Sequence, residues 1–143
     1  HIPGHGLAKV DSHFSTPYIN KTLQYLLKND FKAFKNKNSF FAMTGHLIFN
    51  QIDKDNTVTH SRKLINIIRK KIGFKNLLIS DDLSMKSLKK GLKINTIDTF
   101  KAGCNLALHC NGKLKEMEIV GKNSPLVSKF IIKKTSQFYN ILR

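Results

Sequence analysis

Two short stretches hold most of the residues in this sequence that could do chemistry. Residues 1–13 read HIPGHGLAKVDSH, and a carboxylate, Asp11, stands two residues before the imidazole of His13. In an irregular loop this spacing lets the carboxylate accept a hydrogen bond from one ring nitrogen, which orients the ring and raises its basicity. The other ring nitrogen would then face a substrate. A turn cap at Asp11 beside an exposed, inert His13 is the structural alternative.

The second stretch is Ser80-Asp81-Asp82, at the end of a short apolar run. Successive residues of a strand point to opposite faces, so at most one of the two carboxylates enters a central site. A carboxylate there could act as a nucleophile and form a covalent glycosyl intermediate. The alternative is a helix cap at Asp82 with a solvated Asp81. We expect the two stretches to be the two halves of one active site.

The elements that would position these residues follow from the hydrophobic pattern. Apolar residues 39–44, 76–80 and 105–109 predict three buried strands. Helical spacing or capping predicts helices before, between and after them, at residues 19–34, 61–72, 96–102 and 125–142, with a helical turn at 85–88. The remaining residues 1–18, 50–59 and 110–123 are interpreted as loops. The alternation predicts the α/β class, with a parallel sheet and helical crossovers.

Polar residues follow each predicted strand: His46, Asp81 and His109. In α/β barrels and open α/β sheets the functional site lies at the carboxyl ends of the strands. His5 and His46, taken alone, are interpreted as structural. No paired histidines stand on a predicted helix, and the two cysteines lack zinc-ligand spacing and are too few for a disulfide framework, so we expect no metal and a reducing compartment.

The composition is strongly basic, with a net charge of +16 from 25 Lys and Arg residues. Such a balance suits nucleic acid or an anionic membrane surface. The basic residues are almost all lysines, they are spread along the chain, and no basic stripe interleaved with aromatic residues is present. The pattern favours a solvated surface over a nucleic-acid partner, and no apolar run of about 18 residues predicts a membrane span.

Several motifs resemble, in the same order, those of the bacterial β-N-acetylglucosaminidases of glycoside hydrolase family 3. That family carries Lys-His-Phe-Pro-Gly-His-Gly followed by Asp-Ser-His, and the first thirteen residues here are similar to it. Further similarities cover the strand end Met-Thr-Ala-His, a helix exit ending in Gly-Phe, the nucleophile segment and an Ala-Gly-Ala-Asp motif. The corresponding segments are residues 42–46, 67–74, 79–85 and 102–105.

The resemblance implies a role for each matching residue. Asp81 would be the nucleophile, and His13, partnered by Asp11, would be the general acid and base of a retaining hydrolase. His1 would bind sugar hydroxyls, and His46 is a possible substrate-binding residue. The implied reaction removes terminal non-reducing N-acetyl-β-D-glucosamine, in particular from cell-wall muropeptide fragments, in the cytoplasm. No metal or organic cofactor is implied.

The implied fold is a partial TIM (β/α)8 barrel, its C-terminal half. A complete barrel needs about 250 residues, so we expect residues 1–143 to be one incomplete domain. Residues 1–112 would hold the motif-bearing βα units and residues 113–143 a C-terminal loop and helix. The missing N-terminal half would be a partner, and we expect negligible turnover from the isolated chain. Asn76 and Ile2 depart from the family, which has a glycine and an aromatic residue there.

Two other functions stay open. A glycoside phosphorylase is one, because a neutral histidine repels an attacking phosphate less than a carboxylate does. A basic, non-catalytic module that binds nucleic acid or an anionic glycan is the other.

Overall fold

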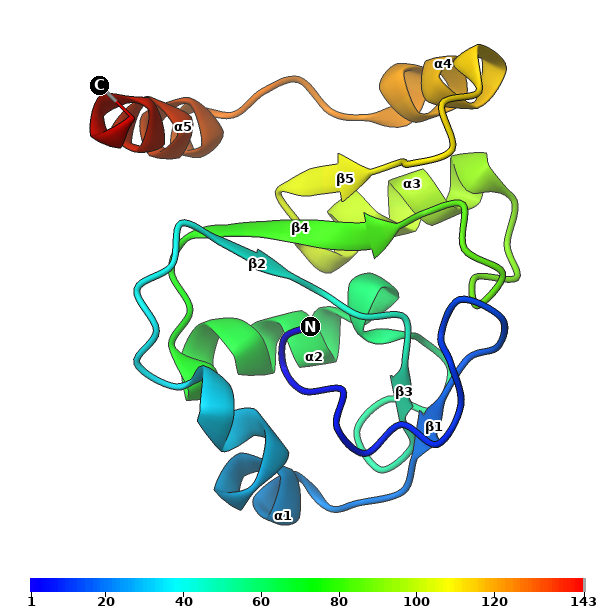
Figure 1. Ribbon diagram of the computed structural model, residues 1–143, viewed down its shortest axis with the longest axis vertical. Coiled ribbons are helices and arrows are strands. Elements are labelled where there is room, and N and C mark those ends of the chain that lie inside the picture. The colour runs from blue at the N-terminus through cyan, green and yellow to red at the C-terminus, as the bar shows by residue number, and fades with distance from the viewer. Residues whose placement is uncertain (143) are drawn as a thin grey trace.

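Three parallel strands form the sheet that carries the candidate site in the computed structural model, which describes residues 1–142 (Figure 1). The strands are β2 (Phe41–Met43), β4 (Leu77–Asp82) and β5 (Leu106–Leu108), in the order β2-β4-β5. Ile2 adds a parallel bridge to Thr44 at the outer side of β2. The N-terminal segment therefore lies directly beside the sheet, at the end where β2 stops.

The central strand β4 is buried on both faces. Leu77, Leu78 and Ser80 are each 0% exposed. A continuous apolar run, without alternation, is what a strand covered on both sides requires. The polar residues of β4 come only at its carboxyl end, where the run finishes in Asp81 and Asp82.

Helix α2 (Arg62–Ile67) crosses back from β2 toward β4 and continues as a π-helix (Ile68–Ile72). Ser61 caps its start, because its hydroxyl accepts a hydrogen bond from the Leu64 amide at 3.2 Å. Gly73 ends the helix with φ +85°, a left-handed conformation that favours glycine. The predicted helix at 61–72 is confirmed at both ends.

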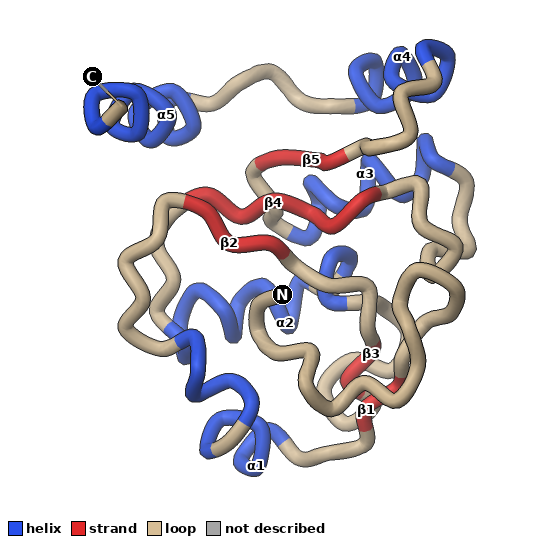
Figure 2. The backbone as a smooth tube through the Cα atoms, viewed as in Figure 1, coloured by secondary structure: helices blue, strands red, loops and turns tan. Residues whose placement is uncertain are grey.

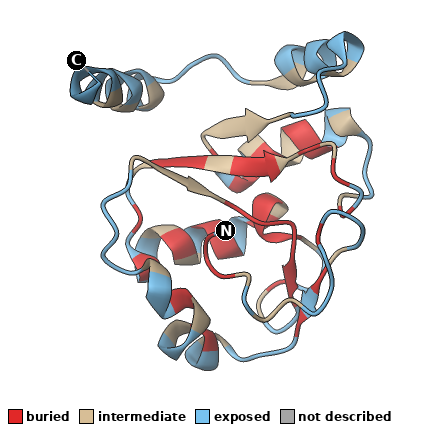
Figure 3. Cartoon of the chain, in the orientation of Figure 1, coloured by how far each residue is buried: buried red, intermediate tan, exposed pale blue. Residues whose placement is uncertain are grey.

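Helix α3 (Leu92–Ala102) links β4 to β5 and begins four residues before the predicted 96–102 segment. Gly103 ends it at φ +115°. At residues 85–88 a single turn forms, closed by the hydrogen bond from the Leu88 amide to the Met85 carbonyl at 3.1 Å, but no helix follows from it, and turns and bends connect β4 to α3. Figure 3 shows that the burial of the chain concentrates in β4, β3 and the inner faces of α2 and α3.

The helix predicted at residues 19–34 is confirmed only from Leu23 onward, and there it is divided into two helices. β1 (Tyr18–Ile19) pairs in parallel with β3 (Ile48–Phe49), so the buried Ile19 belongs to a second, two-stranded sheet. Helix α1 (Leu23–Lys28) follows and breaks at Asn29 before a 3-10 helix (Asp30–Phe34). Spacing along the chain could not reveal a strand partner 30 residues away.

The C-terminal residues form two exposed helices, α4 (Leu114–Asn123) and α5 (Lys129–Ile141). The loop predicted at 110–123 is therefore wrong, while the final helix is confirmed with a later start, at the Ser128 cap. Figure 2 shows both helices beyond the sheet, on the side opposite α2. Neither helix has a buried residue. The ring of Phe138 in α5 packs on the rings of Phe40, just before β2, and Phe41, in β2. Within residues 1–142 no helix is long and apolar enough to cross a membrane.

Candidate active site

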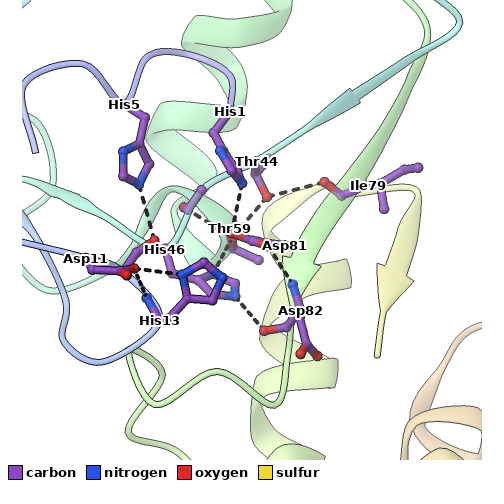
Figure 4. Close-up of polar contacts among 12 residues, drawn as sticks. His1, His5, Asp11, His13, Thr44, His46, Thr59, Ile79, Asp81 and Asp82 are labelled. Atoms are coloured by element: carbon purple, nitrogen blue, oxygen red, sulfur yellow. Dashed lines mark hydrogen bonds and ion pairs between the residues drawn. The ribbon is translucent and has the colours of Figure 1, made fainter. Parts of the chain in front are cut away.

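Asp81 stands at the carboxyl end of β4 and is 9% exposed. Its Oδ2 lies 3.1 Å from His1 Nε2, and its Oδ1 accepts the Asp82 amide at 2.9 Å (Figure 4). The bridge between Ile2 and Thr44 explains why His1 arrives there, because it fixes the first residues beside the sheet. The sheet thus brings together a histidine from the first motif stretch and a carboxylate from the second.

The contact between His1 and Asp81 favours the charged form of both side chains. The hydrogen bond to Asp81 raises the pKa of the His1 imidazole above its ordinary value of 6.5, against the opposing effect of burial. Burial raises the pKa of the Asp81 carboxyl, but the hydrogen bonds from His1 and from the Asp82 amide outweigh it and leave that pKa below 3.8. Asp81 is therefore an anion at neutral pH, the form that a carboxylate nucleophile requires.

The side chain of Asp82 points away from His1. Its Oδ1 accepts the amides of Ser84 at 3.0 Å and Cys110 at 3.2 Å, and its Oδ2 accepts the Ser84 hydroxyl at 2.7 Å. The carboxylate therefore stabilises the turn after β4. The alternation expected for the Asp81-Asp82 pair is confirmed, because only Asp81 faces His1.

His46 lies beneath the strand end and is 0% exposed. Its Nε2 is 2.9 Å from the Asp82 carbonyl oxygen, which only accepts, so Nε2 carries the proton. Nδ1 then accepts from the Thr59 hydroxyl at 2.9 Å. Burial lowers the pKa of His46 and keeps the ring neutral. Both ring nitrogens are used inside the protein, so this geometry leaves neither of them for a sugar hydroxyl.

Thr59 is a residue that the sequence did not single out. It is 0% exposed, and its hydroxyl also lies 2.9 Å from that of Thr44, beside the end of β2. The chain Thr44–Thr59–His46 therefore connects the end of β2 to the carbonyl of Asp82. In the sequence Thr59 stands in a polar stretch interpreted as a loop, and no local signal distinguishes it.

Asp11 and His13 form the pair predicted from their spacing. His13 Nδ1 donates to Asp11 Oδ1 at 2.7 Å, and the His13 amide donates to the same oxygen at 2.8 Å. These bonds, from the amide first and then from the ring, lower the pKa of Asp11. Nε2 of His13 is left as the second ring nitrogen, as expected. The His13 side chain is 71% exposed and the Asp11 side chain is 56% exposed, so the pair lies on the surface of the loop.

The loop that carries His13 packs closely on Asp30 at Gly4 and is held by a contact from His5. A Cβ on Gly4 would collide with the Asp30 carboxylate, so any other residue there would force Asp30 to move. His5 Nε2 lies 3.3 Å from the hydroxyl of the buried Ser12. Figure 4 draws both candidate pairs in one view. Within residues 1–142, no hydrogen bond or ion pair joins His13 directly to Asp81.

His109, after the third strand, does not join His46 and Asp81. Its Nε2 contacts Glu116 Oε2 of α4 at 3.0 Å, and this hydrogen bond lowers the pKa of Glu116 to about 2. The strand ends thus contribute His46 and Asp81 to one cluster and His109 to another. In the described part of the chain, no three His, Cys, Asp or Glu side chains are grouped so as to hold a metal ion.

A parallel sheet with helical crossovers, an anionic carboxylate at a strand end and a His–Asp pair on a loop are features of an α/β-barrel glycoside hydrolase. The chain belongs to glycosyl hydrolase family 3. The family model for the glycosyl hydrolase family 3 N terminal domain matches residues 1–135. The expected fold, a partial (β/α)8 barrel with parallel strands, is confirmed by this membership and by the solved structures below.

Named relatives agree with this family. The β-hexosaminidase of Haemophilus influenzae (strain Rd) is 36% identical over 119 residues, which cover 78% of this chain and 33% of that protein. The crystal structure of CbsA from Thermotoga neapolitana superposes with a TM-score of 0.81 at 26% identity, over 100% of this chain and 36% of that one. Native NagZ from Neisseria gonorrhoeae gives a TM-score of 0.79 at 28% identity, over 94% and 40%. The chain therefore spans about a third to two fifths of these relatives.

Proposed function

We propose that this chain supplies the catalytic residues of a retaining β-N-acetylhexosaminidase, which removes terminal non-reducing N-acetyl-β-D-glucosamine. The observation that carries the proposal is the charged Asp81 carboxylate, held by His1 at the end of β4. The name β-hexosaminidase on relatives that are 36% and 34% identical supports the reaction class.

In the first step of the proposed reaction, Asp81 attacks the anomeric carbon while protonated His13 gives its Nε2 proton to the leaving oxygen. The Nδ1 proton stays directed at Asp11, which stabilises the imidazolium. In the second step, neutral His13 takes a proton from water, and that water releases the sugar from Asp81. Two inversions at one carbon give net retention.

His1 and His46 act on either side of Asp81. The His1 side chain is 37% exposed, so a sugar can contact its ring while Nε2 holds Asp81. His46 is buried and bonded to the Asp82 carbonyl, so we assign it to positioning the strand end in place of the substrate contact expected from the sequence. In this proposal the sugar contacts Asp81 and the partly exposed ring of His1, and it does not contact the buried His46.

The rest of the proposal concerns the surroundings of the site. A complementary barrel segment would supply the other walls of the sugar pocket, because the chain spans only about a third of its H. influenzae relative. Muropeptide fragments as substrates, and a cytoplasmic location, follow from the family resemblance and stay predictions.

The test uses a hybrid barrel in which residues 1–135 replace the matching segment of the H. influenzae β-hexosaminidase. We expect release of 4-nitrophenol from 4-nitrophenyl N-acetyl-β-D-glucosaminide, with the β-anomer of the sugar appearing first by proton NMR. A folded hybrid without turnover, or one that forms the α-anomer first, would contradict the proposal. The isolated chain, assayed beside it, is expected to show negligible turnover.

The same assay separates hydrolysis from phosphorolysis. With phosphate added, a hydrolase still forms free sugar, whereas a phosphorylase forms the sugar 1-phosphate. Product analysis by anion exchange distinguishes the two, and we expect free sugar.

A further inference from the structure

An acidic residue outside the two motif stretches contacts the N-terminal loop. Asp30 is the first residue of the 3-10 helix Asp30–Phe34, and its carboxylate accepts a hydrogen bond from the Gly6 amide. A Cβ on Gly4 would collide with this carboxylate, and one on Gly6 would lie 3.1 Å from Asp30 Oδ1. The two glycines therefore let the turn at residues 4–6 close around the Asp30 side chain.

His5, the residue between the two glycines, connects this turn to both catalytic pairs. Its ring centroid lies 5.3 Å from that of His1, whose Nε2 is 3.1 Å from Asp81 Oδ2 (Figure 4). His5 Nε2 also lies 3.3 Å from the hydroxyl of Ser12, in the middle of the Asp-Ser-His motif. A displacement of His5 would thus reach the nucleophile and the acid–base pair together.

The sheet fixes the other side of this segment. A Cβ on Gly45, which follows the end of β2, would meet the side chains of both histidines, at 3.3 and 3.5 Å. The Ile2 amide donates to the Met43 carbonyl at 2.7 Å. Residues 1–5 therefore lie between the end of β2 and a turn that Asp30 holds.

On the basis of the function proposed above, we propose that Asp30 is a positioning residue for both halves of the candidate site. Its carboxylate fixes the turn at residues 4–6. Through His5, that turn sets where His1 and the loop of His13 lie. A misplacement of about 1 Å caused far from the chemistry can cost 10²-fold in rate. Loss of the Asp30 carboxylate should therefore lower kcat, although it touches no reacting atom.

The structural alternative is that Asp30 only stabilises the start of its 3-10 helix, where a negative charge is favourable. Burial raises the pKa of the Asp30 carboxyl, whereas the hydrogen bond from the Gly6 amide and the nearby His5 lower it. The groups that stabilise the charged carboxylate thus belong to the N-terminal loop, which favours the positioning role.

The first test follows the imidazole rings of His1 and His5 by ¹H–¹⁵N NMR in the 143-residue chain. In Asp30→Ala the turn loses its acceptor, so we expect both ring signals to move. Asp30→Asn retains an acceptor oxygen and should move them less. Asp55→Ala, at an exposed carboxylate of another loop, is the control and should leave them unchanged. Unmoved ring signals in Asp30→Ala, with or without a lower melting temperature, would overturn the proposal.

Gly6→Ala tests the same contact from the loop side and leaves the 3-10 helix unaltered. Its Cβ would lie 3.1 Å from Asp30 Oδ1, closer than side chains normally pack, so the turn must shift. We expect the same ring signals to move, with little further shift when Asp30→Ala is already present, because the alanine leaves room. Additive shifts, or unmoved signals in Gly6→Ala alone if Asp30→Ala does not fold, would contradict the proposal.

The second test measures kcat in the hybrid barrel. Asp30→Ala should lower kcat about 10- to 100-fold, and Asp30→Asn should recover part of the loss. A folded Asp30→Ala hybrid with the kcat of the unsubstituted hybrid would overturn the positioning role and leave the proposed function intact. An unsubstituted hybrid without turnover would contradict the proposed function, while the ring signals still report whether Asp30 positions His1 and His5.

Discussion

The two halves of the candidate site differ in how the fold holds them. Asp81 is 9% exposed, and His1, the Asp82 amide and the buried chain through His46 surround it. The Asp11–His13 pair is 56% and 71% exposed and holds itself together by bonds within a few residues. One half is built into the sheet, and the other is a local unit on a loop.

This difference separates two tasks. A nucleophile must approach the anomeric carbon from a fixed direction, so a rigid strand end suits it. A general acid and base must exchange protons with the leaving group and with water, so an exposed ring nitrogen suits it. Catalytic hydrogen bonds in ligand-free proteins are often long and tighten only with substrate. The two halves should therefore respond differently to substitution, in activity and in stability.

The largest effect is expected for Asp81→Asn in the hybrid barrel. The variant removes the attacking oxygen anion, and kcat should fall on the order of 10³-fold or more. Asp82→Asn is the matched control, because its side chain stabilises a turn and does not face His1. If both variants lose activity equally, the assignment of the nucleophile to the buried half is wrong.

His13→Gln should lower kcat by about 10²- to 10³-fold, because proton transfer is lost. Asp11→Asn should lower it less, by disturbing the ring orientation. Since both side chains are exposed and bonded only locally, neither variant should shift the melting temperature of the 143-residue chain by more than about 1 °C. A large loss of stability in either one would contradict the view that this half is a local unit.

Acid should weaken the buried region through His60. Burial, above all, lowers the pKa of His60 from 6.5 to about 4, while its Nε2 donates to the Asn95 carbonyl at 3.1 Å. Between these pH values the unfolded chain binds more protons than the folded one, so stability falls as the pH falls. The loss amounts to roughly 3 kcal/mol. Urea unfolding of the wild type between pH 7 and 4 measures it.

His60→Gln provides the control for that pH dependence. Glutamine can still donate to the Asn95 carbonyl but does not titrate, so its stability curve should be flatter over the same range. An equally steep curve would assign the pH dependence to other groups.

Thr59→Val should have the smallest effect. It removes the hydroxyl that bonds His46 Nδ1, which leaves a buried acceptor unpaired and costs about 1–2 kcal/mol. Thr59→Ser retains the hydroxyl and should recover most of the loss. Equal stability of the valine variant and the wild type, from urea unfolding, would mean that the chain from Thr44 to His46 does not support the strand end.

The contrast between the two halves also explains what the sequence could predict. The Asp11–His13 bond follows from spacing over two residues, so local geometry was enough. The strand ending in Asp81 follows from an apolar run that needs no partner to be recognised. In both cases the physical signal lies within one short segment.

Other features depend on contacts between distant segments. Ile19 pairs with Phe49, 30 positions away, and Thr59 bonds His46, 13 positions away. In neither case does the sequence around one residue indicate its partner. Helix α4 was missed because Lys and Glu residues and Gly121 separate its apolar residues, so the stretch resembles a polar loop. The contact of His1 with Asp81 needs the bridge between Ile2 and Thr44, which only the folded chain shows.

The most direct test of the central claim is to trap the covalent intermediate. The hybrid barrel is incubated with a slow 5-fluoro derivative of N-acetyl-β-D-glucosaminyl fluoride, digested with pepsin and analysed by tandem mass spectrometry. We predict one sugar adduct, on Asp81, and none in the Asp81→Asn variant. An adduct on Asp82 or on any other residue, with turnover intact, would contradict the account.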